Sequence, residues 1–231
     1  MIFFNKVSKI YPASQAKKEN VVFKDVSFKI EKGEFVLIVG KSGAGKTTLF
    51  KLILGEGKPT GGRIFFNEQD IAKIPVSRIH LLRRKIGMVF QDYKLLSRKT
   101  VYENISCIME AIGISDDEIA RNVPELLEVV GLSDKAYHFP YELSGGEQQK
   151  VSIARALICN PEIVLADEPT GNVDPYSAMD IINLLLKVNE TGTTIVLATH
   201  NKDIVKHLNK RVITIGDGKV VKDELSGKFR I

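Results

Sequence analysis

The sequence has only two cysteines, Cys107 and Cys159, and they lie far apart. Neither has a C-x-x-C or histidine partner spacing, which argues against a zinc site and a disulfide framework. We expect both to be reduced and buried. Long apolar runs are also missing, since no stretch approaches the ~20 residues that cross a bilayer, and the first residues lack the order of a signal peptide. We therefore expect a cytoplasmic chain that reaches a membrane only through a partner.

The 231 residues include 44% hydrophobic and 26% charged side chains, as in ordinary globular proteins. This length suits one large α/β domain, alone or with a smaller subdomain. The formal charge is +5 and the pI is near 9.0. Such a mild basic excess suits nucleic acid or an anionic membrane face, and it equally suits a solvated surface rich in lysine.

One glycine-rich stretch has the form G-x-x-x-x-G-K-[ST], between the apolar run 35–39 and a helix-like segment, 49–54. Glycines let the backbone turn tightly and aim N–H groups at a polyphosphate, which the following helix N-terminus also attracts. We expect Lys46 to reach the β- and γ-phosphates and Thr47 to ligate Mg²⁺. The alternative is a glycine turn without a ligand. The candidate nucleotide-binding residues of this loop are Gly40, Lys41, Ser42, Gly43, Ala44, Gly45, Lys46, Thr47 and Thr48.

Apolar periodicity and turn residues predict the remaining elements. Strands are expected at 2–10, 21–30, 35–39, 63–66, 86–90, 162–166, 194–198, 211–215 and 219–222. Helices are expected at 101–112, at 116–130, from Ser144 to Asn160, and from Pro175 to Glu190. Pro124 should start or kink a helical piece. The first two strands then form an antiparallel lead-in, and roughly 92–160 forms a helical subdomain inserted in an α/β core.

Two carboxylates follow the apolar strand at 162–166. Asp167 stands where it can hold a Mg²⁺ shell, and Glu168 can accept a proton from the water that attacks a γ-phosphate. In isolation, an acidic pair at a strand end can equally cap a helix or a turn. The phosphate loop elsewhere in the chain favours the catalytic interpretation.

The stretch from Leu143 to Gln148 reads L-S-G-G-E-Q, and Ser144 with Glu147 forms a capping-box pattern. With the phosphate loop, the acidic pair, Gln91 and His200, it resembles the nucleotide-binding subunits of ATP-binding cassette (ABC) transporters along essentially the whole chain. The usual fifth signature residue is glutamine, where this chain has Glu147. The resemblance implies a P-loop NTPase fold with a mixed sheet, forming a single ABC domain over residues 1–231.

The resemblance also implies roles for other residues. The signature of one copy would close on the ATP held by a second copy, so that a homodimer encloses two ATP molecules head to tail. His200 would hold the γ-phosphate and the attacking water, and Gln91 would contact Mg²⁺ and water. Tyr11 would stack on adenine, although a core or rim tyrosine is an alternative. The implied contacts at the interface are Ser144, Gly145, Gly146, Glu147 and Asp174.

Within this family, the chain looks most like the cell-division ATP-binding proteins of the FtsE group. This resemblance is carried by the segment from Leu82 to Asp92, by Leu95-Leu96 and by the run from Thr100 to Asn104. This implies an integral membrane partner resembling FtsX at the cytoplasmic face of the membrane, and control of peptidoglycan hydrolysis. The run from Leu165 to Asn172 is shared with lipoprotein-release and macrolide-type exporters, which are the alternative. A basic cluster is either the partner surface or a solvated face. Its members are Arg78, Arg83, Arg84, Lys85, Lys94, Arg98 and Lys99.

Two other classes use a phosphate loop. ABC proteins that act on nucleic acid or ribosomes generally carry two cassettes or a long inserted coiled coil, and this chain shows neither, so we expect no nucleic-acid partner. A P-loop kinase or GTPase would leave the signature and His200 without a role. The stretch Asn201-Lys202-Asp203 also lacks the spacer of the guanine-binding motif N-K-x-D.

Overall fold

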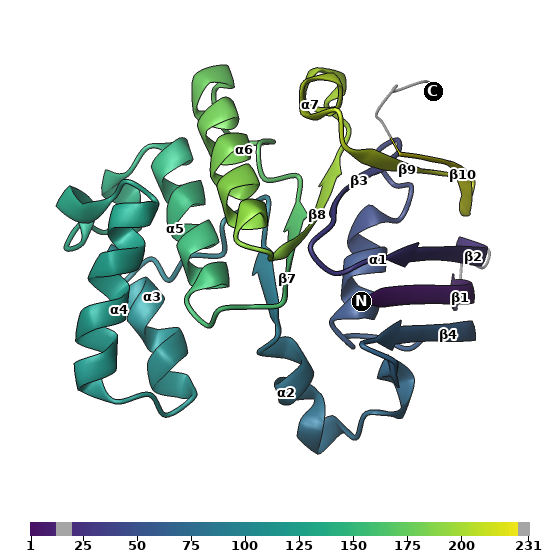
Figure 1. Cartoon of the computed structure of the whole chain (residues 1–231), viewed down its shortest axis with the longest axis horizontal. Helices are drawn as coiled ribbons and strands as arrows, with labels where there is room; N and C mark the ends of the chain where they lie inside the picture. Colours follow the sequence, from purple (N-terminus) through teal and green to yellow (C-terminus); the bar gives the residue numbers. More distant parts are fainter. Residues whose placement is uncertain (13–19, 226–231) are drawn as a thin grey trace. The chain divides into compact units, whose positions relative to one another are not determined.

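The computed structural model describes residues 1–12 and 20–225, which form two compact units. One unit contains residues 1–83 and the chain from Thr194 onward, and the other contains residues 84–193. Figure 1 shows the elements of both units. Within residues 1–12 and 20–225, none of the helices combines the length and the apolar character of a membrane-spanning segment.

The first unit begins with an antiparallel sheet in the order β2-β1-β4-β5. Its strands lie side by side in Figure 1, and β1 pairs with β2 from Ile2 opposite Ile30. Ile2 and Phe4 alternate with exposed positions, and the rings of Phe4 and Phe28 stack with their centroids 4.5 Å apart. The antiparallel lead-in is thus confirmed. The strands are β1 (Ile2–Tyr11), β2 (Asn20–Ile30), β4 (Gly61–Phe66) and β5 (Gln69–Asp70).

A second set of strands in this unit places β3 between β8 and β9, both parallel to it. All five residues of β3 are buried, as expected for a strand covered on both faces. Antiparallel β9 and β10 form a hairpin, in which Asp217 and Gly218 have φ of 48° and 74° at the turn. The elements are β3 (Phe35–Val39), α1 (Lys46–Ile53), β8 (Thr194–Thr199), α7 (Lys202–Leu208), β9 (Arg211–Gly216) and β10 (Lys219–Glu224).

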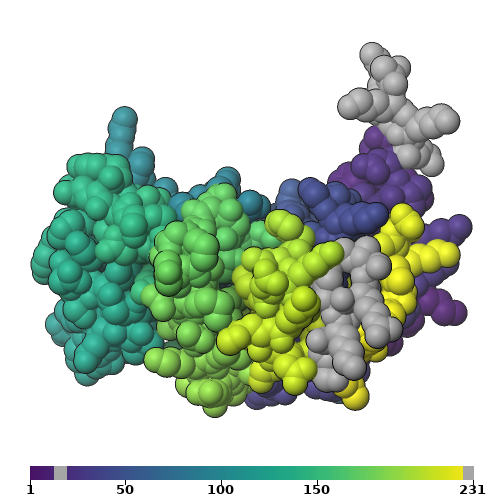
Figure 2. All heavy atoms as spheres, turned by 90° about the horizontal axis from the view of Figure 1, so that it is seen from above, coloured from purple at the N-terminus to yellow at the C-terminus, as the bar shows by residue number. Residues whose placement is uncertain are grey.

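The second unit pairs β6 (Ile86–Val89) in parallel with β7 (Ile163–Asp167). Helices α3, α4 and α5 come between these strands in the chain, and α6 follows β7. Figure 2 shows α3 to α5 in teal and α6 in green. The four helices are α3 (Val101–Ala111), α4 (Asp116–Val129), α5 (Gly145–Leu157) and α6 (Pro175–Glu190). The compact unit is longer than the helical subdomain expected at 92–160, since it also holds both strands and α6.

Several local predictions differ from the structure. Helix α4 runs through Pro124, so no new helix begins there, and a kink at this proline stays a prediction. Helix α1 starts at Lys46 rather than Leu49, directly after Gly45. Both cysteines are half-buried rather than buried. Short helical pieces without a long apolar period were not predicted; they are η1 (Ile71–Lys73), η2 (Val76–Arg78), α2 (Ile79–Arg83), η3 (Ser133–Lys135), η4 (Pro140–Glu142) and α7.

Candidate nucleotide-binding site

The phosphate loop connects the buried strand β3 to α1, and its glycines are required by the backbone. Gly43 and Gly45 have φ of 80° and 97°, in the left-handed region that L-residues rarely adopt. A Cβ on Gly45 would also lie 2.7 Å from Cγ1 of Val22, and one on Gly40 would lie 2.6 Å from the carbonyl oxygen of Ile215. The loop therefore has a shape that other residues at these positions would disturb.

Lys46 is the first residue of α1, and only 7% of it is exposed. Its Nζ donates to the carbonyl oxygens of Gly40 at 2.9 Å and Lys41 at 3.3 Å. The ammonium group is thus held inside the loop, next to the helix N-terminus that favours anions. No acidic residue occupies the first turn of α1, so nothing there opposes a bound phosphate.

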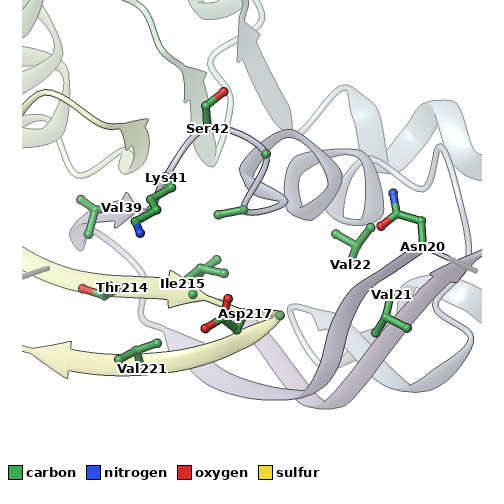
Figure 3. A pocket seen from close by; sticks show the side chains of 15 residues that line it. Asn20, Val21, Val22, Val39, Lys41, Ser42, Thr214, Ile215, Asp217 and Val221 are labelled. Carbon is green, nitrogen blue, oxygen red and sulfur yellow. The ribbon is translucent and has the colours of Figure 1, made fainter.

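A cavity of about 500 Å³ adjoins the loop within the first unit. Its walls are the loop at 39–44, the start of β2 at 20–22, and the β9–β10 hairpin. Figure 3 shows Lys41 pointing from the loop toward the strand that carries Ile215, while Ser42 points away from that strand. The volume lies in the range that accommodates small ligands and nucleosides.

Two other candidate residues of the first unit lie at strand ends. His200 is exposed directly after the buried strand β8, and the Asn201 side chain caps α7 by accepting from the N–H groups of Asp203 and Ile204. His200 is therefore fixed between a strand and a capped helix. Tyr11 ends β1 with 39% of it exposed, and Nζ of Lys9 lies 4.8 Å from the centroid of its ring.

In the second unit, β7 delivers the two carboxylates. All five residues of β7 are buried, and Asp167 at its end is 8% exposed. Glu168 then has φ of 48°, which costs about 1–2 kcal/mol for a residue with a Cβ. A hydrogen bond of 3.0 Å from the N–H of Gly171 to the Glu168 carbonyl closes this turn.

The signature helix α5 begins with the expected capping box. The Ser144 hydroxyl accepts from the Glu147 N–H at 3.3 Å, and the Ser144 N–H donates to the Glu147 carboxylate at 2.7 Å. The hydrogen bond from the Ser144 backbone lowers the pKa of Glu147 below its ordinary value. The capping prediction is confirmed.

Gln91 and Asp174 are two further candidates in this unit. Gln91 is exposed just after β6. Asp174 caps α6 by accepting from the N–H groups of Tyr176 and Ser177, both at 3.0 Å. Hydrogen bonds from Ser177 lower the pKa of Asp174.

These features agree with comparisons to known proteins. The family model described as ABC transporter matches residues 23–171. The chain belongs to the ABC transporter family. It is 49% identical to the "Cell division ATP-binding protein FtsE" of Bacillus subtilis, over 99% of this chain and 98% of that protein. The protein of the same name from Mycobacterium tuberculosis is 45% identical with the same coverage.

A solved ABC cassette has the same fold. It is described as "Dimeric structure of a post-hydrolysis state of the ATP-binding cassette MJ0796 bound to ADP and Pi", and the TM-score is 0.88 at 36% identity. The alignment covers 99% of this chain and all of that one. The α/β ABC ATPase fold expected from the sequence is thereby confirmed.

The candidate residues of this cassette divide between the two units. Lys46, Thr47 and His200 belong to the first, and the signature and acidic residues belong to the second. Within the second unit, the structure brings Gln91, the start of α5 and the loop before α6 together. A Cβ on Gly145 would lie 3.0 Å from the Asn172 carbonyl, and one on Gly171 would lie 2.9 Å from Nε2 of Gln91.

The donor set of the cassette suits Mg²⁺. No cluster of three histidine, cysteine or acidic side chains that could hold a metal alone occurs in residues 1–12 and 20–225. Thr47 in the first unit, and Asp167 and Gln91 in the second, each carry an oxygen donor. Mg²⁺ prefers oxygen donors and usually takes few protein ligands besides waters and substrate phosphates. The donor types that each unit carries are therefore the types that this ion takes.

The sequence predicted no role for Tyr93, Gln149 or Asn172. In the structure, Asn172 and Gln149 bind the backbone of residues 90–91, and Tyr93 binds Asn172. Asn172 Nδ2 donates to the Gln91 carbonyl at 2.9 Å, and Nε2 of Gln149 donates to the Phe90 carbonyl at 3.3 Å. Asn172 lies in the run that follows β7, but no pattern within the sequence reveals its distant partner.

Proposed function

We propose that the chain is the ATP-hydrolysing subunit of an ABC-type membrane complex that acts in cell division. The observation that carries ATP binding is the phosphate loop, in which Gly43 and Gly45 have a left-handed backbone and the buried Lys46 donates to the Gly40 carbonyl at the start of α1. The role in cell division is supported by the two relatives of that name, which the chain matches along nearly its full length.

Each residue has a stated role in the proposed reaction. Lys46 and the amides of the loop bind the phosphates, and Tyr11 contacts adenine. Thr47, Asp167 and Gln91 would hold Mg²⁺, which neutralises charge on the phosphates when bound. Glu168 accepts the proton of the attacking water, and His200 orients that water. Because phosphoryl transfer needs positioning and charge stabilisation more than covalent help, these roles suffice for hydrolysis.

The proposed active form is a head-to-tail dimer of two copies. The start of α5 supplies amide groups that suit a γ-phosphate, and the signature residues there would meet the ATP of the second copy. The relative bound to ADP and phosphate is described as dimeric, which supports this arrangement. ATP binding would close the dimer, and hydrolysis would release it.

An FtsX-like integral membrane protein is the proposed partner, with the chain held at the cytoplasmic face of the membrane and the complex regulating peptidoglycan hydrolysis. Part of the basic cluster is already paired, since Lys85 lies 3.0 Å from Glu162 and Lys94 lies 2.6 Å from Asp92. Purification of the tagged chain from membranes of its own cell tests this proposal. An exporter permease in place of an FtsX-like protein would contradict it.

The catalytic assignment is tested by Glu168→Gln, which keeps the side-chain shape but removes the base. We expect ATP binding to persist, ATP-bound dimers to accumulate, and the hydrolysis rate to fall by roughly two to four orders of magnitude. Size-exclusion chromatography and phosphate release provide the measurements. The control is Glu125→Gln, on an exposed position of α4. A monomer with normal turnover would refute the role of Glu168.

A further inference from the structure

Gln91 is held by a loop that lies 80 residues further along the chain. Nδ2 of Asn172 donates to the carbonyl oxygen of Gln91 at 2.9 Å. Gly171, which precedes Asn172, has no side chain and so leaves space for the side chain of Gln91. A Cβ on Gly171 would lie only 2.9 Å from Nε2 of Gln91. Both the main chain and the side chain of Gln91 are therefore placed by residues 171–172.

The opposite side of this loop is held by Tyr93. Its hydroxyl donates to the carbonyl oxygen of Asn172 at 2.9 Å, so Asn172 receives a hydrogen bond from the same segment to which it donates one. Burial raises the pKa of Tyr93, which keeps the hydroxyl in its donor form. Tyr93 and Lys94 have φ of 60° and 53°, a conformation that non-glycine residues rarely adopt. The backbone therefore turns at residues 93–94, where the Tyr93 side chain reaches Asn172.

Two side chains of the signature helix α5 also bind the backbone of residues 90–94. Nη1 of Arg155 donates to the Lys94 carbonyl at 2.6 Å, and Gln149, which is fully buried, donates to the Phe90 carbonyl. At the start of that helix, a Cβ on Gly145 would lie 3.0 Å from both the Asn172 carbonyl and the Tyr93 hydroxyl. The start of the signature helix therefore packs closely against the donor and the acceptor of the Tyr93–Asn172 hydrogen bond.

We propose that Asn172 and Tyr93 form a clasp that positions Gln91 for hydrolysis and couples it to the signature helix. The proposal rests on the proposed ATPase function, because Gln91 is assigned there to Mg²⁺ and water. Asn172 and Tyr93 are positioning residues, since they act through Gln91. The same clasp reaches Glu168, because the Gly171 N–H that precedes Asn172 donates to the Glu168 carbonyl.

The decisive variant is Asn172→Asp, which has the same shape but presents a carboxylate to the Gln91 carbonyl. We expect kcat to fall roughly ten-fold, with the affinity for ATP changed by less than about two-fold, because the lost hydrogen bond serves the hydrolysis step. Tyr93→Phe should lower kcat by about three-fold, since it removes one neutral hydrogen bond. Asn122→Asp, an exposed position on α4 with the same change of charge, is the matched control and should behave as the parent.

A double-mutant cycle distinguishes positioning from a role in folding. Gln91→Ala removes the side chain that the clasp positions but retains the carbonyl that Asn172 contacts. If the clasp acts through Gln91, Asn172→Asp should have little further effect on kcat in the Gln91→Ala background. Single-turnover measurement of phosphate release keeps slow variants measurable, and Tyr93→Phe replaces Asn172→Asp in the cycle if the latter fails to fold.

An equal fold-loss in both backgrounds would overturn the proposal, as would an unchanged kcat of Asn172→Asp in the parent. Failure of the proposed function gives different results. The parent would then hydrolyse no ATP, or Gln91→Ala alone would leave kcat unchanged.

Discussion

Ser144 offers a test that separates helix capping from contact with a nucleotide. The Ser144 hydroxyl caps α5, and Ser115 caps α4 in the same way by accepting from the Glu118 N–H at 3.4 Å. Both serines are exposed and lie in the same unit. Replacement of either by alanine should cost about 1 kcal/mol of stability, or a decrease in Tm of roughly 2–4 °C. If α5 faces a phosphate, only Ser144→Ala should also lose ATPase activity.

Ser144→Asp makes the test sharper, because aspartate is as good a helix cap as serine. Its stability should fall only by the repulsion between the new carboxylate and that of Glu147 in the capping box. A carboxylate about 4 Å from a phosphate charge would repel it by about 4 kcal/mol at an effective dielectric constant near 20. Hydrolysis should then fall by about three orders of magnitude. The assay is phosphate release at saturating ATP, alongside thermal unfolding. Parent-like turnover by Ser144→Asp would refute the placement of the α5 start at a phosphate.

Two further predictions concern the phosphate loop and the capping box. Gly45→Ala should abolish ATP binding in a filter assay and destabilise the chain by about 1–3 kcal/mol, since its φ is 97° and the new Cβ would meet Val22; normal ATP affinity would contradict this reading. Because the pKa of Glu147 is lowered in the folded chain, its ionised form stabilises the fold at pH values above the ordinary pKa of 4.5. This contribution is lost as the pH falls through the folded-state pKa. In urea unfolding between about pH 6 and pH 3, Glu147→Gln should therefore lose less stability than the parent; identical slopes would show that the Ser144–Glu147 interaction contributes little.

Local patterns predicted much of the fold because their causes lie within a few residues. The strand–loop–helix order around Gly40–Thr48, the capping box at Ser144 and the start of α6 after Asp174 each depend on neighbours in the chain. Helix α7 was missed because seven residues contain too few apolar repeats to indicate a helix. Pro124 did not start a new helix because the capped first turn at Ser115 begins α4 eight residues earlier.

The candidate site was harder to predict where it depends on contacts between distant segments. The residue types at Lys46, Asp167 and Glu168 indicate their chemistry, but the left-handed backbone of Glu168 has no local signal such as glycine. The contact between Asn172 and Gln91 likewise joins positions 81 apart in the chain. Periodicity and spacing do not report which loops meet after folding.

The capping box also bears on how two copies would associate. Ser144 and Glu147 already hold the first turn of α5 in place with two reciprocal hydrogen bonds. An anion that reaches this helix start would meet the backbone of Gly145 and Gly146 in an arrangement that needs no ordering on contact. Because preorganised groups lose little conformational entropy on binding, the affinity between copies would be limited mainly by the cost of bringing two bodies together. The signature would then need no reordering when a second copy binds.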